Sequence, residues 1–152
     1  MKNLARVLLS ISIPVCASFN SFAQSVSVID HIAICVKDLK KSTDFYTRIM
    51  HFEKVADPFN DHMHQWYNIG KGVKMHAIQG DCQLQHQIAD HLCFAVNSVK
   101  EFADELKKNN IPYRNWKGDS TEPTLRADGV LQLYFQDPDG YWIEINSPAP
   151  KK

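Results

Sequence analysis

The chain has 152 residues and equal numbers of basic and acidic side chains, 17 of each, so its formal net charge at pH 7 is zero. This length corresponds to one domain. A balanced charge without a basic cluster argues against nucleic acid as a partner. After residue 23 no apolar run reaches the roughly 18 residues that a membrane-spanning helix needs. We therefore expect no membrane partner for the remainder of the chain.

Residues 1–23 have the features of a secretory signal peptide. Lys2 and Arg6 provide a charged start, a mostly apolar stretch follows, and the segment ends on the small residue Ala23. We expect cleavage after Ala23 and a periplasmic or secreted protein. The alternative is a lipoprotein signal with Cys16 as the lipidated residue, but the residues before this cysteine are a poor match to such a motif.

The remainder of the chain contains two copies of one unit. The stretch "DHIAICVKDLKKSTDFYTRIM" from residue 30 aligns with "DHLCFAVNSVKEFADELKKNN" from residue 90. Each copy begins with Asp-His, continues as an alternating strand, and then changes to apolar residues at helical spacing. Asp38 or Ser42 can cap the first helix, and Ser98 can cap the second. The repeat predicts one strand followed by one helix in each copy.

Short strands bounded by turn residues follow each helix. We expect them at 52–57, 63–69 and 73–79 in the first copy, and at 112–115, 130–136 and 141–147 in the second. The stretch "KGVKMHAI" of the first copy matches "DGYWIEI" of the second, so the extra residues of the second copy fall in the polar loop 117–129. "QDPDGYW" is interpreted as a tight turn without a catalytic role. The sequence predicts an α+β fold of two tandem βαβββ modules, at about 28–80 and about 88–147, that form a curved sheet or cup.

The two-residue period of a strand assigns each side chain to one face of its sheet. His31 and His91 begin the first strands of the two modules, and His76 and Glu144 occupy matching places on the last strands. All four are predicted to point away from the helix-packed face, into the cup. Imidazole and carboxylate groups are common ligands of transition metals. We therefore predict a divalent metal ion there (Zn, Ni, Mn or Fe), with an organic ligand bound without metal as the alternative.

Other side chains extend this candidate site. Trp142 and Trp66 offer aromatic surface for a substrate, and Arg126 in the extra loop can clamp an anionic group. Ordinary core and surface roles are the alternatives. His62 and His64 form a His-x-His pair that we expect on one strand face, although no further ligand is evident beside it. His86 lies in a polar loop and is expected at the surface.

Three cysteines follow the signal peptide: Cys35, Cys82 and Cys93. An odd number leaves at least one thiol unpaired within the chain. Cys35 and Cys93 share the cup face with the strand histidines. We interpret them as small apolar packing residues, with soft metal ligands or a disulfide between these two as alternatives.

Three stretches resemble the vicinal oxygen chelate superfamily, which includes glyoxalase I, bleomycin-resistance proteins and extradiol dioxygenases. They are "DHIAICVKDLKKSTDFYTRIMHFEKV", "DHLCFAV" and "QLYFQDPDGYWIEI". Metal-dependent members carry their ligands on the first and last strands of each module, which here are the positions of His31, His76, His91 and Glu144. Glyoxalase I-like sites usually have glutamate where this chain has His76. The dioxygenase branch uses two histidines and one glutamate, which His31, His91 and Glu144 would supply.

The resemblance implies a metal-dependent lyase or isomerase of glyoxalase type. Such an enzyme binds two vicinal oxygens of a small-molecule substrate and stabilises an enediolate, with Glu144 as ligand and catalytic base. An Fe(II) extradiol-type dioxygenase is one alternative, and a non-catalytic binding or resistance protein is another. Members often pair modules between chains, which implies a homodimer.

Overall fold

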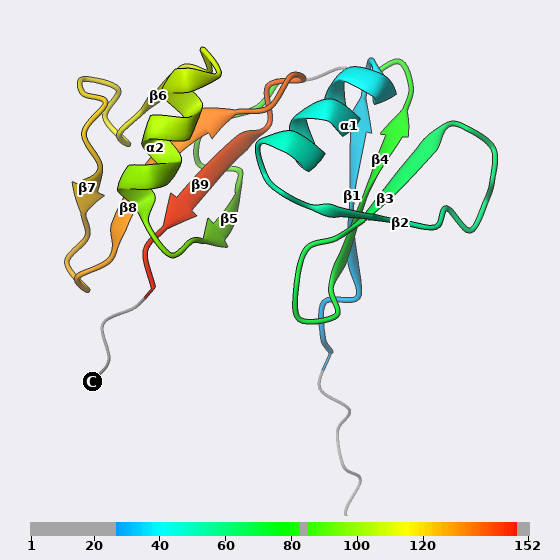
Figure 1. Cartoon of the computed structure of the whole chain (residues 1–152), viewed down its shortest axis with the longest axis horizontal. Coiled ribbons are helices and arrows are strands. Elements are labelled where there is room, and N and C mark those ends of the chain that lie inside the picture. Colours follow the sequence, from blue (N-terminus) through cyan, green and yellow to red (C-terminus); the bar gives the residue numbers. More distant parts are fainter. Residues whose placement is uncertain (1–26, 83–84, 149–152) are drawn as a thin grey trace, which may run out of the picture.

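The computed structural model describes residues 27–82 and 85–148, so the predicted signal peptide lies outside the described residues. The chain folds into two mixed sheets that stand side by side, each with one helix (Figure 1). The predicted fold of two βαβββ modules is confirmed. Within the described ranges, no helix combines the length and the apolar character needed to cross a bilayer.

Module one contains the first strand, a helix and three further strands, at positions within a few residues of those predicted. They are β1 (His31–Val36), α1 (Leu39–Arg48), β2 (Glu53–Val55), β3 (His64–Asn68) and β4 (Lys74–Gln79). The sheet order is β1-β4-β3-β2, with β1 parallel to β4 and the other pairs antiparallel. The first and last strands of the module are therefore neighbours.

Module two repeats this order and adds one short strand. Its elements are β5 (His91–Ala95), α2 (Val99–Lys108), β6 (Tyr113–Arg114), β7 (Thr124–Leu125), β8 (Leu131–Gln136) and β9 (Trp142–Asn146). The order is β5-β9-β8-β6, and β7 pairs with β8. β7 lies inside the segment that the sequence predicts to be only a polar loop, because two of its residues form an antiparallel bridge to β8.

Both helices begin at side-chain caps. Asp38 caps α1 by accepting a hydrogen bond from the Lys41 amide at 2.9 Å, and Ser98 caps α2 by accepting one from the Glu101 amide at 3.2 Å. Each cap satisfies a backbone donor that the first helical turn leaves free. The prediction of Ser98 is confirmed, and of the two candidates for α1 the cap is Asp38, because Ser42 is buried one turn inside the helix.

One hydrophobic core joins the modules. The rings of Phe45 on α1 and Phe102 on α2 both pack against Phe135 on β8, with centroid distances of 6.3 and 5.7 Å. Burying aromatic rings supplies most of the packing energy in such a contact. The two sheets are thus held at a defined angle by apolar contacts from both helices.

The tight turn between β8 and β9 reaches across to module one (Figure 1). The Asp139 carboxylate accepts hydrogen bonds from the Lys37 amide at 2.9 Å and from the Ser42 hydroxyl at 2.8 Å. The Tyr46 hydroxyl donates to buried Asp137 at 2.7 Å. Burial raises the pKa of Asp137, and the hydrogen bond from Tyr46 opposes that rise. The turn has a structural role, because it anchors the last strand of module two to α1.

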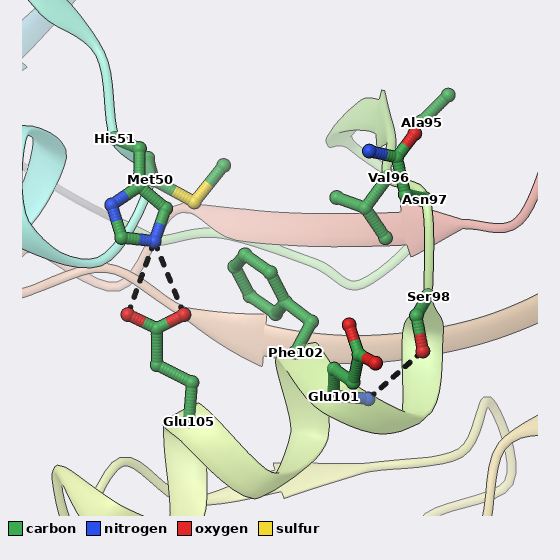
Figure 2. A pocket seen from close by; sticks show the side chains of 9 residues that line it. All are labelled: Met50, His51, Ala95, Val96, Asn97, Ser98, Glu101, Phe102 and Glu105. Atoms are coloured by element: carbon green, nitrogen blue, oxygen red, sulfur yellow. Dashed lines mark hydrogen bonds and ion pairs between the residues drawn. The ribbon is translucent and has the colours of Figure 1, made fainter.

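A second polar contact between modules lies beside a shallow pocket (Figure 2). His51 follows α1 with a positive φ of 56°, and its Nε2 lies 3.1 Å from the Glu105 carboxylate on α2. Met50 and Phe102 form the apolar part of the pocket wall.

A disulfide joins Cys35 on β1 to Cys82, which follows β4. Their Cα atoms lie 5.8 Å apart, within the usual range for a disulfide. The interpretation of Cys35 as a packing residue is therefore wrong, and so is the alternative pairing with Cys93. Cys93 is the free cysteine among the described residues. The disulfide closes module one by tying its first strand to the segment after its last strand.

Candidate metal centre

His31 and His76 form one half of the predicted site, on adjacent strands of module one. Their ring centroids lie 5.3 Å apart with the planes nearly perpendicular. Trp66 on β3 is the register partner of His76, and the two rings stack at 4.0 Å. His76 is only 6% exposed, whereas His31 remains exposed at the edge. The predicted shared face of His31 and His76 agrees with these contacts.

The protonation of His76 suits a metal ligand. Burial lowers its pKa below the ordinary value, and the neighbouring imidazoles of His31 and His64 lower it further. A neutral imidazole keeps a lone pair for a metal ion. The Nδ1 atom of His76 is buried and has no hydrogen-bond partner within the described part of the chain.

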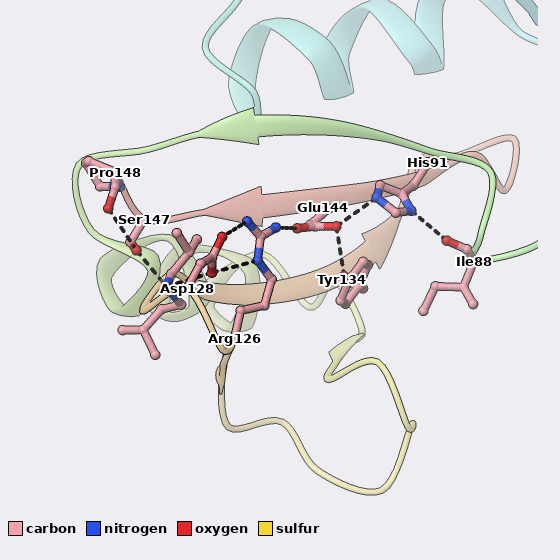
Figure 3. Close-up of polar contacts among 10 residues, drawn as sticks. Ile88, His91, Arg126, Asp128, Tyr134, Glu144, Ser147 and Pro148 are labelled. Carbon is pink, nitrogen blue, oxygen red and sulfur yellow. Dashed lines mark hydrogen bonds and ion pairs between the residues drawn. The ribbon is translucent and has the colours of Figure 1, made fainter. Parts of the chain in front are cut away.

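His91 and Glu144 form the other half, on β5 and β9 of module two (Figure 3). The Nε2 of His91 lies 2.7 Å from Oε2 of Glu144, and the Tyr134 hydroxyl donates to the same oxygen at 2.8 Å. Glu144 is 3% exposed. The proximity to the Glu144 charge, added to burial, raises the pKa of Tyr134, so its hydroxyl keeps its proton and remains a donor.

The contact between His91 and Glu144 brings together two atoms of types that bind metal ions. Nδ1 of His91 lies 2.7 Å from the Ile88 carbonyl, which can only accept a hydrogen bond, so this ring nitrogen carries a proton (Figure 3). In the neutral ring Nε2 then has a lone pair directed at a carboxylate oxygen. A proton between the two atoms accounts for the 2.7 Å contact, since a metal ion bound to both would hold them about 3 Å apart or more. An imidazole nitrogen and a carboxylate oxygen are both ligands that the predicted metal accepts, so a slight separation of the pair would fit it.

His31 has the same arrangement as His91. Its Nδ1 lies 2.7 Å from Oδ1 of Asp30, which leaves Nε2 free. Metal-binding histidines usually donate their other ring nitrogen to a carboxylate or a backbone carbonyl, which fixes tautomer and orientation. Both histidines at the start of a module thus have an anchored Nδ1 and an available Nε2.

A single chain holds these groups as two separate pairs. Among the residues that the structure describes, the only group of three or more His, Cys, Asp or Glu side chains with ligand atoms within 4.8 Å of one another is Asp57, Asp61 and His64. The sequence left open whether the four ligands come from one chain or from two, and within one described chain they do not form a single cluster. His31 and His76 form one half-site, and His91 and Glu144 form the other.

The remaining predicted substrate residues lie around both half-sites. Arg126 forms a close two-point ion pair with Asp128, and its Nη1 lies 3.5 Å from Oε1 of Glu144 (Figure 3). Trp142 is the register partner of His91, and the Arg114 guanidinium lies 4.5 Å above its ring. Because Arg126 already has an acidic partner, it is only partly available to bind an anion.

Two sequence interpretations of other histidines are wrong. His62 precedes β3 and has a positive φ of 61°, so it does not share a strand face with His64. His86 is half-buried, with its ring 3.8 Å from the Tyr141 ring, because the loop folds back on the turn before β9. The sequence reasoning also missed Asp57 and Asp61, since a loop carboxylate carries no periodic signal.

Cys93 lies directly opposite Glu144 in the β5–β9 register. Cys93 is an exposed residue, but partial desolvation of its sulfur and the adjacent Glu144 charge raise the pKa of the thiol to about 11. We expect metal-free protein at pH 8 to react with iodoacetamide roughly 100-fold more slowly than an unstructured cysteine peptide, because the thiolate is the reactive form. The rate should rise with pH until about 11. An alkylation midpoint close to that of the peptide would contradict this placement.

The comparisons with known proteins agree with this fold. Residues 28–145 match the family model of the Glyoxalase/Bleomycin resistance protein/Dioxygenase superfamily. A lactoylglutathione lyase of Pseudomonas putida is 26% identical, with 81% of this chain and 86% of that protein covered. The fosfomycin resistance protein FosX of Listeria monocytogenes is 26% identical, with 80% and 90% covered.

Solved structures with the same fold were also found. A crystal structure of FosX from Listeria monocytogenes matches 82% of this chain and 96% of its own, with a TM-score of 0.66 and 24% identity. An integron cassette protein from a harbour metagenome matches 81% of this chain and all of its own, with a TM-score of 0.64 and 21% identity. Because the family model matches most of its length, this chain belongs to the glyoxalase, bleomycin resistance protein and dioxygenase superfamily.

Proposed function

We propose that the protein is an exported, metal-dependent enzyme of glyoxalase type that acts as a lyase or isomerase on a small molecule with vicinal oxygens. The observation that carries the proposal is the convergence of two metal-ligand atoms on buried strands: Nε2 of His91 lies 2.7 Å from Oε2 of Glu144, while Nδ1 of His91 is held by a carbonyl. The proposed ligands are His31, His76, His91 and Glu144, and the metal is Zn, Ni, Mn or Fe.

The complete centre is proposed to form in a homodimer. Each chain carries two half-sites, and two copies related by a twofold axis can place the His31 and His76 pair of one chain against the His91 and Glu144 pair of the other. An open groove beside β5 supports this, because residues such as Leu92 and Phe94 line it together with apolar side chains of module one. A second copy would cover that apolar surface.

A bound divalent metal supplies Lewis-acid polarisation of the two substrate oxygens. The chain supplies the proton acceptor. Oε2 of Glu144 is held by Tyr134 and His91, whereas Oε1 has only the 3.5 Å contact to Arg126. Oε1 is therefore the freer oxygen and the proposed base for the C–H proton. Trp66 and Trp142 are proposed to enclose the substrate and exclude water.

Oxygen activation by Fe(II) is the second candidate, and one observation favours it. His31 and His91 have anchored Nδ1 atoms, whereas Nδ1 of buried His76 has no partner in the described chain. His31, His91 and Glu144 would then form the two-histidine, one-carboxylate set of non-haem iron oxygenases, with His76 outside it.

Export is proposed on two grounds. The N-terminal segment has the pattern of a signal peptide, and Cys35 pairs with Cys82 in a disulfide. Disulfides persist in the periplasm and outside cells, and they are rare in a reducing cytoplasm. Both features suit a protein that acts beyond the inner membrane.

The test is turnover by protein loaded separately with Zn, Ni, Mn or Fe(II). S-lactoylglutathione and fosfomycin are used because relatives are named for them, and catechol tests the dioxygenase alternative. We expect turnover that EDTA abolishes and that metal restores without oxygen. Turnover that needs both Fe(II) and oxygen would select the dioxygenase. Ligand binding that survives EDTA, with no turnover, would make the protein a non-catalytic binding protein.

A further inference from the structure

We propose that module one binds a second divalent cation through Asp57, Asp61 and His64. Asp57 and Asp61 lie between β2 and β3, and His64 begins β3. One ligand atom from each side chain lies within 4.8 Å of the other two. None of these residues belongs to the proposed catalytic centre, so the site adds a cation to the one already proposed.

The distances within this group suit coordination. Nδ1 of His64 lies 2.9 and 3.0 Å from the two Asp61 oxygens. Two ligands at right angles, each about 2.1 Å from an ion, lie about 3.0 Å apart. A cation can therefore replace the proton between His64 and Asp61 without a change of rotamer, and Asp57 can reach the same ion.

The group is held in place before any ion binds. The Phe59 amide donates to Asp57 at 3.0 Å, and the Met63 amide donates to Asp61 at 2.9 Å. Each amide contacts only one oxygen of its carboxylate and leaves the other oxygen available. The His64 side chain, only 17% exposed, is fixed at the start of a strand. Pre-organised ligands reduce the entropy lost on binding.

The charge of the group also favours a cation. Two carboxylates bring two negative charges. Among the ion pairs of the described residues, no Lys or Arg contacts Asp57 or Asp61. Two oxygens and one imidazole suit Mn²⁺ or Zn²⁺.

A separate observation comes from buried His76. Its ring shares the sheet face of His64, stacks nearly parallel to it, and has its centroid 5.8 Å away. His76 is 6% exposed, yet its Nδ1 has no partner in the described ranges. A buried ring nitrogen normally has a hydrogen-bond partner. An unpartnered ring nitrogen thus lies in the row of imidazoles directly beside His64, the histidine of the proposed site.

The experiment counts metal in the full mature chain after equilibrium dialysis against Mn²⁺. We expect two equivalents per chain in the wild type and one in the Asp57→Asn/Asp61→Asn variant. The His31→Ala/Glu144→Ala variant should also keep one equivalent, which leaves the second site occupied. The control Asp44→Asn/Asp104→Asn removes two exposed helix carboxylates outside both sites and should keep two equivalents.

A second measurement does not depend on the loop variant folding. In the His31→Ala/Glu144→Ala protein, Mn²⁺ should broaden the imidazole NMR signals of His64 before those of His51. An unchanged metal count in Asp57→Asn/Asp61→Asn, with equal broadening of both histidines, would overturn the second site. If the His31→Ala/Glu144→Ala variant bound as much metal as the wild type while Asp57→Asn/Asp61→Asn bound less, the result would support the second site and contradict the proposed catalytic centre.

Discussion

The Glu144→Gln variant is expected to lose turnover and to bind metal more than about 100-fold more weakly, because loss of an outer-shell partner alone costs roughly 10- to 100-fold. The amide removes the negative charge and offers only a weak ligand oxygen. The amide oxygen can still accept the hydrogen bond of the Tyr134 hydroxyl, so the variant removes the charge with little change in packing. Metal affinity is measured by competition with a chelator, and turnover by the substrate screen.

The matched control is Glu105→Gln. Glu105 is also a glutamate with a histidine partner, His51, but it lies on α2 outside both half-sites. This variant should keep wild-type metal affinity and turnover. If Glu144→Gln behaved like Glu105→Gln on a real substrate, Glu144 would be neither ligand nor base.

Removal of the Cys35–Cys82 disulfide has the largest expected effect on stability. The bond closes a loop with a sequence separation of 47 residues. A cross-link of this span restricts the unfolded chain and typically contributes about 2–4 kcal/mol. The Cys35→Ser/Cys82→Ser variant should lower the free energy of unfolding by that amount, measured by urea denaturation without reductant.

Two controls separate the disulfide from a general effect of the substitutions. Wild-type protein in dithiothreitol should have the same urea midpoint as the double variant. Cys93→Ser removes an exposed, free thiol and should change the free energy of unfolding by less than about 0.5 kcal/mol. Equal stability of wild type and double variant without reductant would contradict the pairing.

The fold was largely predictable because it is a repeat. Asp-His at the start of each copy, helical spacing after it and short strands afterwards placed most elements within a few residues. Strand parity also placed His31 and His76 on one face of module one, and His91 and Glu144 on one face of module two, and each pair is in contact. The two-residue period of a strand gives the sheet face of each side chain, and this is enough to predict which side chains of neighbouring strands can come into contact.

Other features depend on contacts that periodicity does not encode. The partner of Cys35 is decided by how the segment after β4 folds back, and strand parity alone pointed to Cys93. The left-handed backbone at His62 broke the expected His-x-His pair. Separation of the four predicted ligands into two pairs follows from how the sheets sit relative to each other, which core packing decides.

The most direct test of the proposed centre mixes two variants. His31→Ala and Glu144→Ala homodimers are purified, mixed, partly unfolded and refolded together, and metal content is compared before and after. If the centre uses one half-site from each chain, each mixed dimer regains one intact centre, so metal content and turnover rise. If all four ligands met within one chain, every chain would still carry a broken centre. No gain on mixing, with mixed dimers demonstrated, would contradict the account.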